Sequence, residues 1–117
     1  MQPENRDSAS LWDMLCYARE VAERVAGRTF EQYQADKDFR LATERRIEII
    51  GEAADRVSKA FREKHAEIPW QKIIAQRHIL AHEYDEIIDE KIWKVATIYV
   101  PDLVALLVPL VPAPPSS

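Results

Sequence analysis

The chain has 117 residues, of which 47% are hydrophobic and 31% are charged. This balance is typical of one folded domain and excludes a disordered chain. The net charge of −4, from 16 basic and 20 acidic residues, argues against broad electrostatic capture of nucleic acid, although a small basic patch can still meet a phosphate backbone. The 2 glycines are too few for a turn-rich β fold and favour helices.

The single cysteine, Cys16, excludes a disulfide framework within the chain and fits a reducing cytoplasm. The N-terminal residues contain no apolar signal-peptide core. The apolar run at 103–111 is too short to cross a membrane. We therefore expect a cytoplasmic protein with one helical domain over residues 7–111 and flexible termini at 1–6 and 112–117.

Hydrophobic periodicity predicts a first helix that begins at Asp7 or Ser8, either of which can cap exposed N–H groups, and stops at Gly27. Thr29 is expected to cap a short helical turn through Tyr33. The apolar positions of the first helix recur every three or four residues, at Leu11, Met14, Leu15, Ala18, Val21, Ala22 and Val25.

A long amphipathic helix is predicted over residues 38–65. Gly51 within it indicates close approach of a neighbouring helix. Pro69 fits the first turn of a fourth helix, and a fifth is predicted from about Asp89, where Pro101 should kink or break it. The two expected stripes are Ile47, Ile50, Ala54, Val57 and Phe61, then Ile92, Val95, Tyr99, Leu103, Leu106 and Leu110. The expected fold is all-α, an antiparallel helical bundle of four main helices plus one short helix.

The segment 77–84 places an arginine, two histidines and a tyrosine close together in the sequence. Continuing the helical count from Trp70 and Ile73 puts Arg77 on the apolar stripe, where a cation needs a partner or a function. A cation, a group that titrates near neutrality and a phenol at an apolar face favour phosphate chemistry.

Arg77 and His82 do not share a helix face, because five residues at about 100° each place them about 140° apart. Either the helix loosens there, or the arginine reaches around, or a second chain completes the site. In a two-fold dimer, one His82 would take the proton of an RNA 2′-hydroxyl while the other protonates the leaving 5′-oxygen. Arg77 would hold the phosphate, and Tyr84 would bind it or stack on a base. This route needs no metal and no other cofactor.

Structural roles are open alternatives for each of these residues. His82 can satisfy carbonyl groups at a helix end, and Tyr84 can be an aromatic residue at the edge of the core. Arg77 can form a salt bridge to a carboxylate such as Glu52. His78 and His82 have a spacing that can share a metal, but no third ligand stands at a diagnostic distance in the sequence.

Four blocks in order resemble the HepT-like toxins, a branch of the HEPN superfamily. The R-x4-H-x-Y motif of that family matches Arg77 to Tyr84, and its long-helix signature resembles Glu44 to Ala54. The blocks span about residues 11–108, and their order makes the resemblance specific where R-x4-H alone is weak. The other two blocks are the lead-in Glu67-Ile68-Pro69-Trp70 and the final-helix sequence Tyr84-Asp85-Glu86-Ile87, Trp93, Val95 and Pro101-Asp102-Leu103.

The resemblance implies a helical homodimer, with the motif in a cleft between subunits, that acts as a metal-independent ribonuclease toxin. Arg77 and His82 would be the catalytic pair, with His78 and Tyr84 positioning the substrate. A small nucleotidyltransferase antitoxin would transfer AMP from ATP to Tyr84. His78 stands where many HEPN ribonucleases have a small polar residue, so a second titratable group is present. The alternative is a non-catalytic dimeric adaptor, or nucleotide-binding partner, of a nucleotidyltransferase.

Overall fold

The computed structural model describes residues 5–82 and 86–111, and side chains within these ranges except those of Asn5 and residues 77–88. All regular structure in these ranges is helical, so the prediction of an all-α fold is confirmed for them. The elements are α1 (Asn5–Val25), α2 (Phe30–Ala35), α3 (Lys37–Arg56), α4 (Lys59–Lys64), α5 (Trp70–His82), α6 (Glu86–Lys94), the π-helical segment η1 (Val95–Tyr99) and α7 (Val100–Leu107).

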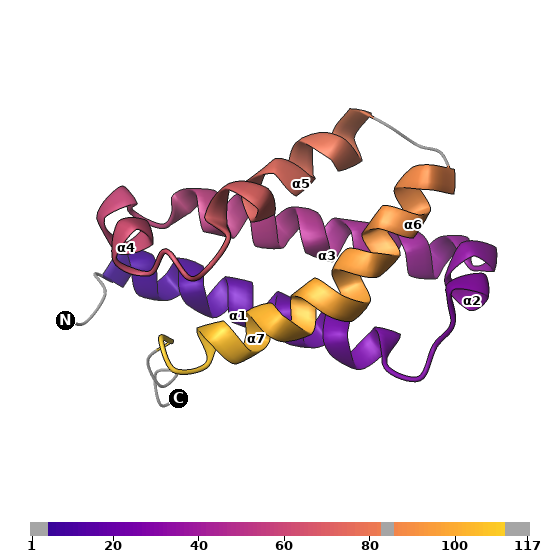
Figure 1. The fold of residues 1–117 in the computed structure, drawn as a ribbon, viewed down its shortest axis with the longest axis horizontal. Coiled ribbons are helices and arrows are strands. Elements are labelled where there is room, and N and C mark those ends of the chain that lie inside the picture. Colours follow the sequence, from indigo (N-terminus) through magenta and orange to yellow (C-terminus); the bar gives the residue numbers. More distant parts are fainter. Residues whose placement is uncertain (1–4, 83–85, 112–117) are drawn as a thin grey trace.

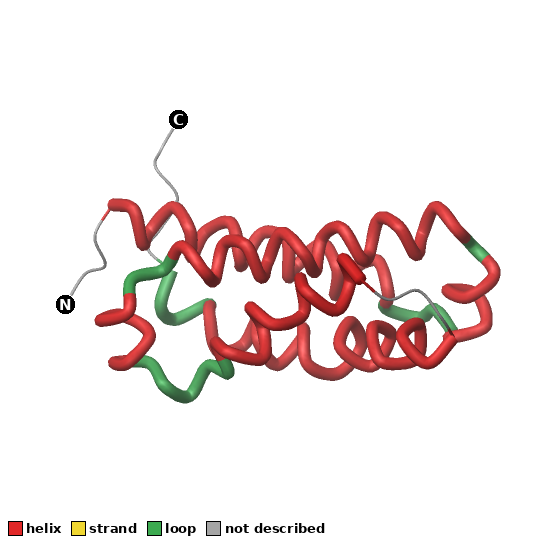
Figure 2. The backbone as a smooth tube through the Cα atoms, turned by 90° about the horizontal axis from the view of Figure 1, so that it is seen from above, coloured by secondary structure: helices red, strands yellow, loops and turns green. Residues whose placement is uncertain are grey.

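The long elements form four rods that run alternately in opposite directions (Figure 1). α1 packs along α3, α3 packs along α5, and α1 packs against α7. The fourth rod is continuous from α6 through η1 to α7. Figure 2 shows that the long axes of the rods run in roughly one common direction and that the short helices lie at the ends. Among the described helices, none has both the length and the hydropathy that crossing a bilayer requires.

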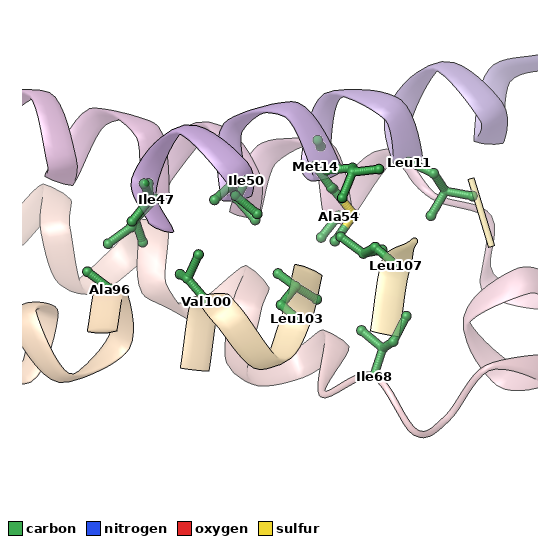
Figure 3. Close-up of a cluster of buried hydrophobic side chains, with 14 of the residues drawn as sticks. Leu11, Met14, Ile47, Ile50, Ala54, Ile68, Ala96, Val100, Leu103 and Leu107 are labelled. Carbon is green, nitrogen blue, oxygen red and sulfur yellow. The ribbon is translucent and has the colours of Figure 1, made fainter. Parts of the chain in front are cut away.

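The core lies between α1, α3 and the fourth rod. Figure 3 shows side chains of α1 and α3 facing those of the fourth rod, among them Leu11, Met14, Ile47, Ile50, Val100, Leu103 and Leu107. The predicted stripe of the first helix is buried except for half-buried Ala22. Burial of this apolar surface is the main force that holds the rods together.

The turn after α1 follows the prediction. Gly27 has a φ of 76°, the left-handed conformation that ends helices and that glycine adopts without strain. The Oγ1 atom of Thr29 accepts a hydrogen bond from the Gln32 N–H at 3.1 Å. The Thr29 N–H donates to Gln32 Oε1 at 2.9 Å. This reciprocal capping box starts α2 and confirms Thr29 as its cap.

The prediction of one helix over residues 38–65 is wrong beyond Arg56. Val57 has extended backbone angles, with φ of −69° and ψ of 137°. Ser58 then caps a new helix, α4, because its Oγ accepts a hydrogen bond from the Phe61 N–H at 3.2 Å. Both Val57 and Phe61 remain buried, so the apolar stripe was correct although the helix is interrupted.

A buried carboxylate fixes this interruption. Asp7 is 4% exposed and accepts hydrogen bonds from the Ser58 N–H at 2.8 Å and the Ser58 Oγ–H at 2.7 Å. The expectation that Asp7 or Ser8 starts the first helix is also wrong, because α1 begins at Asn5. Asp7 therefore stabilises the start of α4 rather than that of its own helix.

Replacing Ser58 with alanine should lower the free energy of unfolding by about 2 kcal/mol, because α4 loses its cap and a buried carboxylate loses a donor. Ser58→Thr keeps the hydroxyl and should lie within about 0.5 kcal/mol of wild type. Urea denaturation of the two variants measures the difference. Equal stability of both variants would contradict this role of the Ser58 hydroxyl.

The last rod begins at Glu86, earlier than the predicted Asp89, and Pro101 does not break it. Instead, the turn before Pro101 is π-helical, and the Val100 N–H donates to the Val95 carbonyl. In a regular α-helix the proline ring would clash with the carbonyl four residues earlier, and the wider turn relieves this crowding. A π-helical turn contains one residue more than an α-helical turn, so the buried face of the rod is shifted from the predicted stripe. The buried residues are Ile92, Ala96, Val100, Leu103 and Leu107.

Candidate functional site

The motif helix α5 runs without interruption from Trp70 to His82, so Arg77, His78 and His82 all lie on it. Tyr84 lies outside the described residues, as do the side chains of the other three. Since the helix is regular up to His82, it does not loosen between Arg77 and His82. The two residues therefore lie about 140° apart around its axis. The remaining options are an arginine that reaches around the helix and a second chain.

The start of the motif helix is anchored by hydrogen bonds. The Ile73 N–H donates to the Pro69 carbonyl at 3.1 Å, which places Pro69 just before the first turn predicted to contain it. The Trp70 indole Nε1–H donates to the His65 carbonyl at 3.0 Å. The Trp70 N–H donates to the Ile68 carbonyl at 2.9 Å. These bonds fix where α5 begins and hence its register up to Arg77.

An apolar groove of about 230 Å³ runs beside the motif helix, between α3, α5, η1 and α7. Gln76, which lines it, directly precedes Arg77. Ile98 and Tyr99, on η1, are 50% and 54% exposed. The prediction that Tyr99 belongs to the buried stripe is wrong, because the π-helical turn rotates it outward. The groove is lined by Ile47, Ile50, Ile73, Val95, Tyr99 and Leu103, among others.

The face of α3 that carries arginines is ion-paired. Arg46 Nε lies 3.1 Å from Glu20 Oε1 on α1. Arg45 Nη1 contacts Glu48 and lies 3.5 Å from Glu52 Oε1. If Arg77 has only a structural role, Glu52 is a candidate for its salt-bridge partner. Glu52 already has a cation partner, Arg45, on its own helix.

Tyr33 on α2 is a buried polar residue that the sequence assigned only to a short turn. It is fully buried, and its ring centroid lies 5.6 Å from that of Phe39 and 5.0 Å from that of Trp93 on α6. Its hydroxyl has no hydrogen-bond partner within the described residues. Burial raises the pKa of Tyr33, and the nearby carboxylates of Glu44 and Asp89 raise it further.

Two carboxyl groups meet beside this tyrosine. Burial raises the pKa of Glu44 on α3, and the charge of Asp89 on α6 adds to the effect, while Arg40 opposes it. Asp89 lies in the first turns of α6, the helix that follows the segment containing Tyr84. The two carboxyl groups therefore come from α3 and from the element next to the motif. No signal in the sequence pairs Glu44 with Asp89, because they are far apart along the chain.

Within the described side chains, no group of three His, Cys, Asp or Glu residues could hold a metal ion. The side chains of His78 and His82, the spacing of which can share a metal, lie outside those residues.

A family model described as Ribonuclease HepT-like matches residues 14–110. The chain belongs to this family. The HepT-like match contains the whole segment 77–84 and all elements from α2 to α7, which confirms the family and the ribonuclease class expected from the sequence. The family match leaves the individual roles of Arg77, His82 and Tyr84 as proposals.

Curated relatives of this HepT-like chain have names of the same kind. "Putative RNase TTE0752" of Caldanaerobacter subterraneus subsp. tengcongensis is 41% identical over 71% of this chain and 74% of its own length. "Putative RNase MJ1380" of Methanocaldococcus jannaschii is 35% identical, over 81% and 87%. "Probable ribonuclease HepT" of Thermococcus cleftensis is 35% identical, over 63% and 67%. No solved structure gives a significant match.

The raised pKa of Glu44 predicts how its replacement changes stability with pH. Between the ordinary pKa of a glutamic acid and its raised folded value, the folded chain binds more protons than the unfolded one. The contribution of Glu44 to stability therefore falls as pH rises through that window. Glu44→Gln should be more stable than wild type at pH 7, and this difference should disappear below about pH 4.

Urea unfolding of wild type and Glu44→Gln at both pH values checks this expectation. Glu63→Gln is the matched control, because Glu63 is an exposed glutamate on α4. A stability difference for Glu44→Gln that does not change with pH would show that the carboxyl group is not responsible.

Proposed function

We propose that this HepT-like chain is a metal-independent endoribonuclease toxin that acts as a cytoplasmic homodimer. The observation that carries the proposal is the family match over residues 14–110, which contains an intact R-x4-H-x-Y sequence at 77–84. The names of two relatives, "Putative RNase TTE0752" and "Probable ribonuclease HepT", support RNA as the substrate class. Arg77 and His82 are the proposed catalytic pair, and His78 and Tyr84 position the RNA.

Two features support a second chain at the site. The uninterrupted α5 keeps Arg77 and His82 about 140° apart, so one copy does not present both on one helix face. Beside α5, the groove and the exposed side chains of Ile98 and Tyr99 form an apolar surface of the kind that protein partners cover. A two-fold axis near the end of α5 would bring two copies of the motif together.

The chemistry uses the nucleophile that RNA carries. One His82 accepts the proton of the 2′-hydroxyl, whose oxygen attacks the adjacent phosphorus. The partner copy's imidazole gives a proton to the 5′-oxygen as the P–O bond to it breaks. Arg77 donates hydrogen bonds to the phosphate oxygens and stabilises the charge of the transition state. The products are a 2′,3′-cyclic phosphate and a free 5′-hydroxyl.

The regulatory partner in this proposal is a minimal nucleotidyltransferase antitoxin that adenylylates Tyr84. AMP on Tyr84 would add bulk and a phosphodiester charge two residues from His82. It would exclude the substrate phosphate and give Arg77 another anion to bind.

The test is cleavage of RNA by the purified dimer with and without EDTA. Cleavage that survives the chelator and leaves 2′,3′-cyclic phosphate ends supports the proposal. Loss of cleavage in EDTA that Zn²⁺ restores would assign the activity to a metal held by His78 and His82 instead.

A second function, favoured by the net charge of −4, is a non-catalytic adaptor that docks a nucleotide phosphate for a nucleotidyltransferase. Calorimetry with ATP and AMP separates the two functions. Nucleotide binding by a protein that cleaves no RNA would favour the adaptor.

A further inference from the structure

An open pocket of about 580 Å³ lies where α4 meets α5. This junction is at the opposite end of α5 from His82, as the course of the ribbon shows (Figure 1). Three cations, Lys59, Arg62 and Lys72, line it together with a single acid, Glu63. The sequence motif does not include any of these residues, and the proposed chemistry does not use them.

The pocket lies in a basic segment of an acidic protein. Residues 59–72 carry four Lys or Arg against two Glu, a net charge of +2, whereas the whole chain has −4. A local excess of this kind attracts an anion even though the protein as a whole repels one.

The walls of the pocket are rigid. Ile68 is 1% exposed and Trp70 is 6% exposed. The Trp70 indole donates to the His65 carbonyl at 3.0 Å, and its ring packs edge-on against Phe61 at 6.5 Å between centroids. Cations on such a platform lose less conformational freedom when they bind a ligand than cations on a loose loop.

The cations are available to a ligand. Lys72 is exposed and has no ion-pair partner among the described residues. Lys59 pairs with Glu63 only at 4.0 Å, with side chains 86% and 68% exposed, which is a weak surface contact. Arg62 lines the pocket, although its Nε is shielded from solvent and finds no acceptor in the described part of the chain.

The start of α5 adds to the positive potential. α5 spans Trp70 to His82, and Gln71 and Lys72 of its first turn line the pocket. The first N–H groups of an α-helix have no partners within the helix and carry a positive partial charge, which favours phosphate groups.

We propose that this pocket binds a backbone phosphate of the substrate RNA and guides the strand along α5 toward the motif. This inference rests on the proposed ribonuclease function. Lys72 lies five residues before Arg77, about 7.5 Å along the helix axis and about 140° around it, so a strand that contacts both must wind around α5. Because Trp70 is buried, the pocket offers no exposed tryptophan ring for a base to stack on. The contact therefore reads the backbone and not the sequence.

The test measures binding of a short, fluorescein-labelled 2′-O-methyl RNA, which this chemistry cannot cleave, to the full-length protein over a range of salt concentrations. The variant is Lys59→Ala/Lys72→Ala, in which both lysines are exposed, so the fold should be retained. The matched control is Arg24→Ala/Lys37→Ala, which removes two exposed cations from α1 and α3.

The pocket variant should bind more weakly. Its plot of log affinity against log salt should be less steep by about 1.4, or about 0.7 for each lost phosphate contact. The control should keep the wild-type slope. For cleavage, the variant should raise KM for a long RNA and leave kcat/KM for a dinucleotide unchanged.

An unchanged slope and affinity in the pocket variant would overturn the proposal. So would displacement of the RNA by polyglutamate at the same concentration of charge, because the pocket would then be a surface for acidic proteins. If wild type cleaves no RNA but binds it through Lys59 and Lys72, the phosphate site stands and the ribonuclease proposal falls.

Discussion

Replacing either Arg77 or His82 with alanine should abolish growth inhibition and RNA cleavage while the protein remains a folded dimer. Loss of a general acid or base costs about 10²- to 10⁴-fold in rate. Loss of a group that stabilises transition-state charge costs about 10²- to 10³-fold. Because the proposed two-fold site uses both copies of His82, the substitution would remove the acid and the base together, so its effect should be the larger.

The measurement is the cleavage rate of purified variants on a labelled RNA, with dimer state checked by light scattering. Arg24→Ala and His65→Ala are matched controls, because they remove the same kinds of side chain from α1 and from the end of α4. Both controls should cleave like wild type. If Arg77→Ala and His82→Ala also cleave like wild type, the assignment of the site is wrong.

His78 makes this experiment more informative. It is a second titratable group one residue after Arg77. If it only positions the RNA, His78→Asn should raise KM and leave the pH dependence of kcat unchanged. A shift in the pH profile would instead make His78 part of the acid–base chemistry.

Co-expression with the proposed nucleotidyltransferase partner should add one or more AMP masses to the chain, all on Tyr84. The same co-expression should silence cleavage, since the added phosphodiester occupies the place of the substrate phosphate. Tyr84→Phe removes the hydroxyl that accepts AMP, so this variant should keep its mass and remain toxic in the presence of the partner. Intact mass spectrometry followed by peptide mapping measures both outcomes.

Tyr99→Phe is the matched control for this substitution, because Tyr99 is 54% exposed and lies outside the motif. It should be modified and silenced in the same way as wild type. AMP that maps to Tyr99 rather than to Tyr84 would separate the regulation of this chain from the motif.

The helical boundaries show where local sequence is enough. Thr29 and Gln32 form a capping box from residues three apart, and Gly27 ends α1 through its own backbone freedom. Such signals depend on near neighbours, so the sequence predicts them correctly. The break after Arg56 depends on a hydrogen bond from Ser58 to Asp7, far away in the sequence, so periodicity alone missed it.

In the last rod, the sequence predicted the position of a disturbance but not its form. Pro101 correctly indicated a disturbance of the helix, since a proline cannot continue regular α-helical bonding. The packed core on both sides of it favours a widened turn over a break, and this choice rotated Tyr99 to the surface.

By itself, the sequence determined the all-α class, the apolar stripes of the first two rods and the family, because periodicity and the order of the R-x4-H-x-Y blocks are properties of neighbouring residues. The tertiary structure alone decided which distant groups meet: Tyr33 with Glu44 and Asp89, Asp7 with Ser58, and the cations of α4 with the start of α5. Such meetings depend on how the rods pack, and packing is set by the summed burial of the whole core rather than by any local pattern.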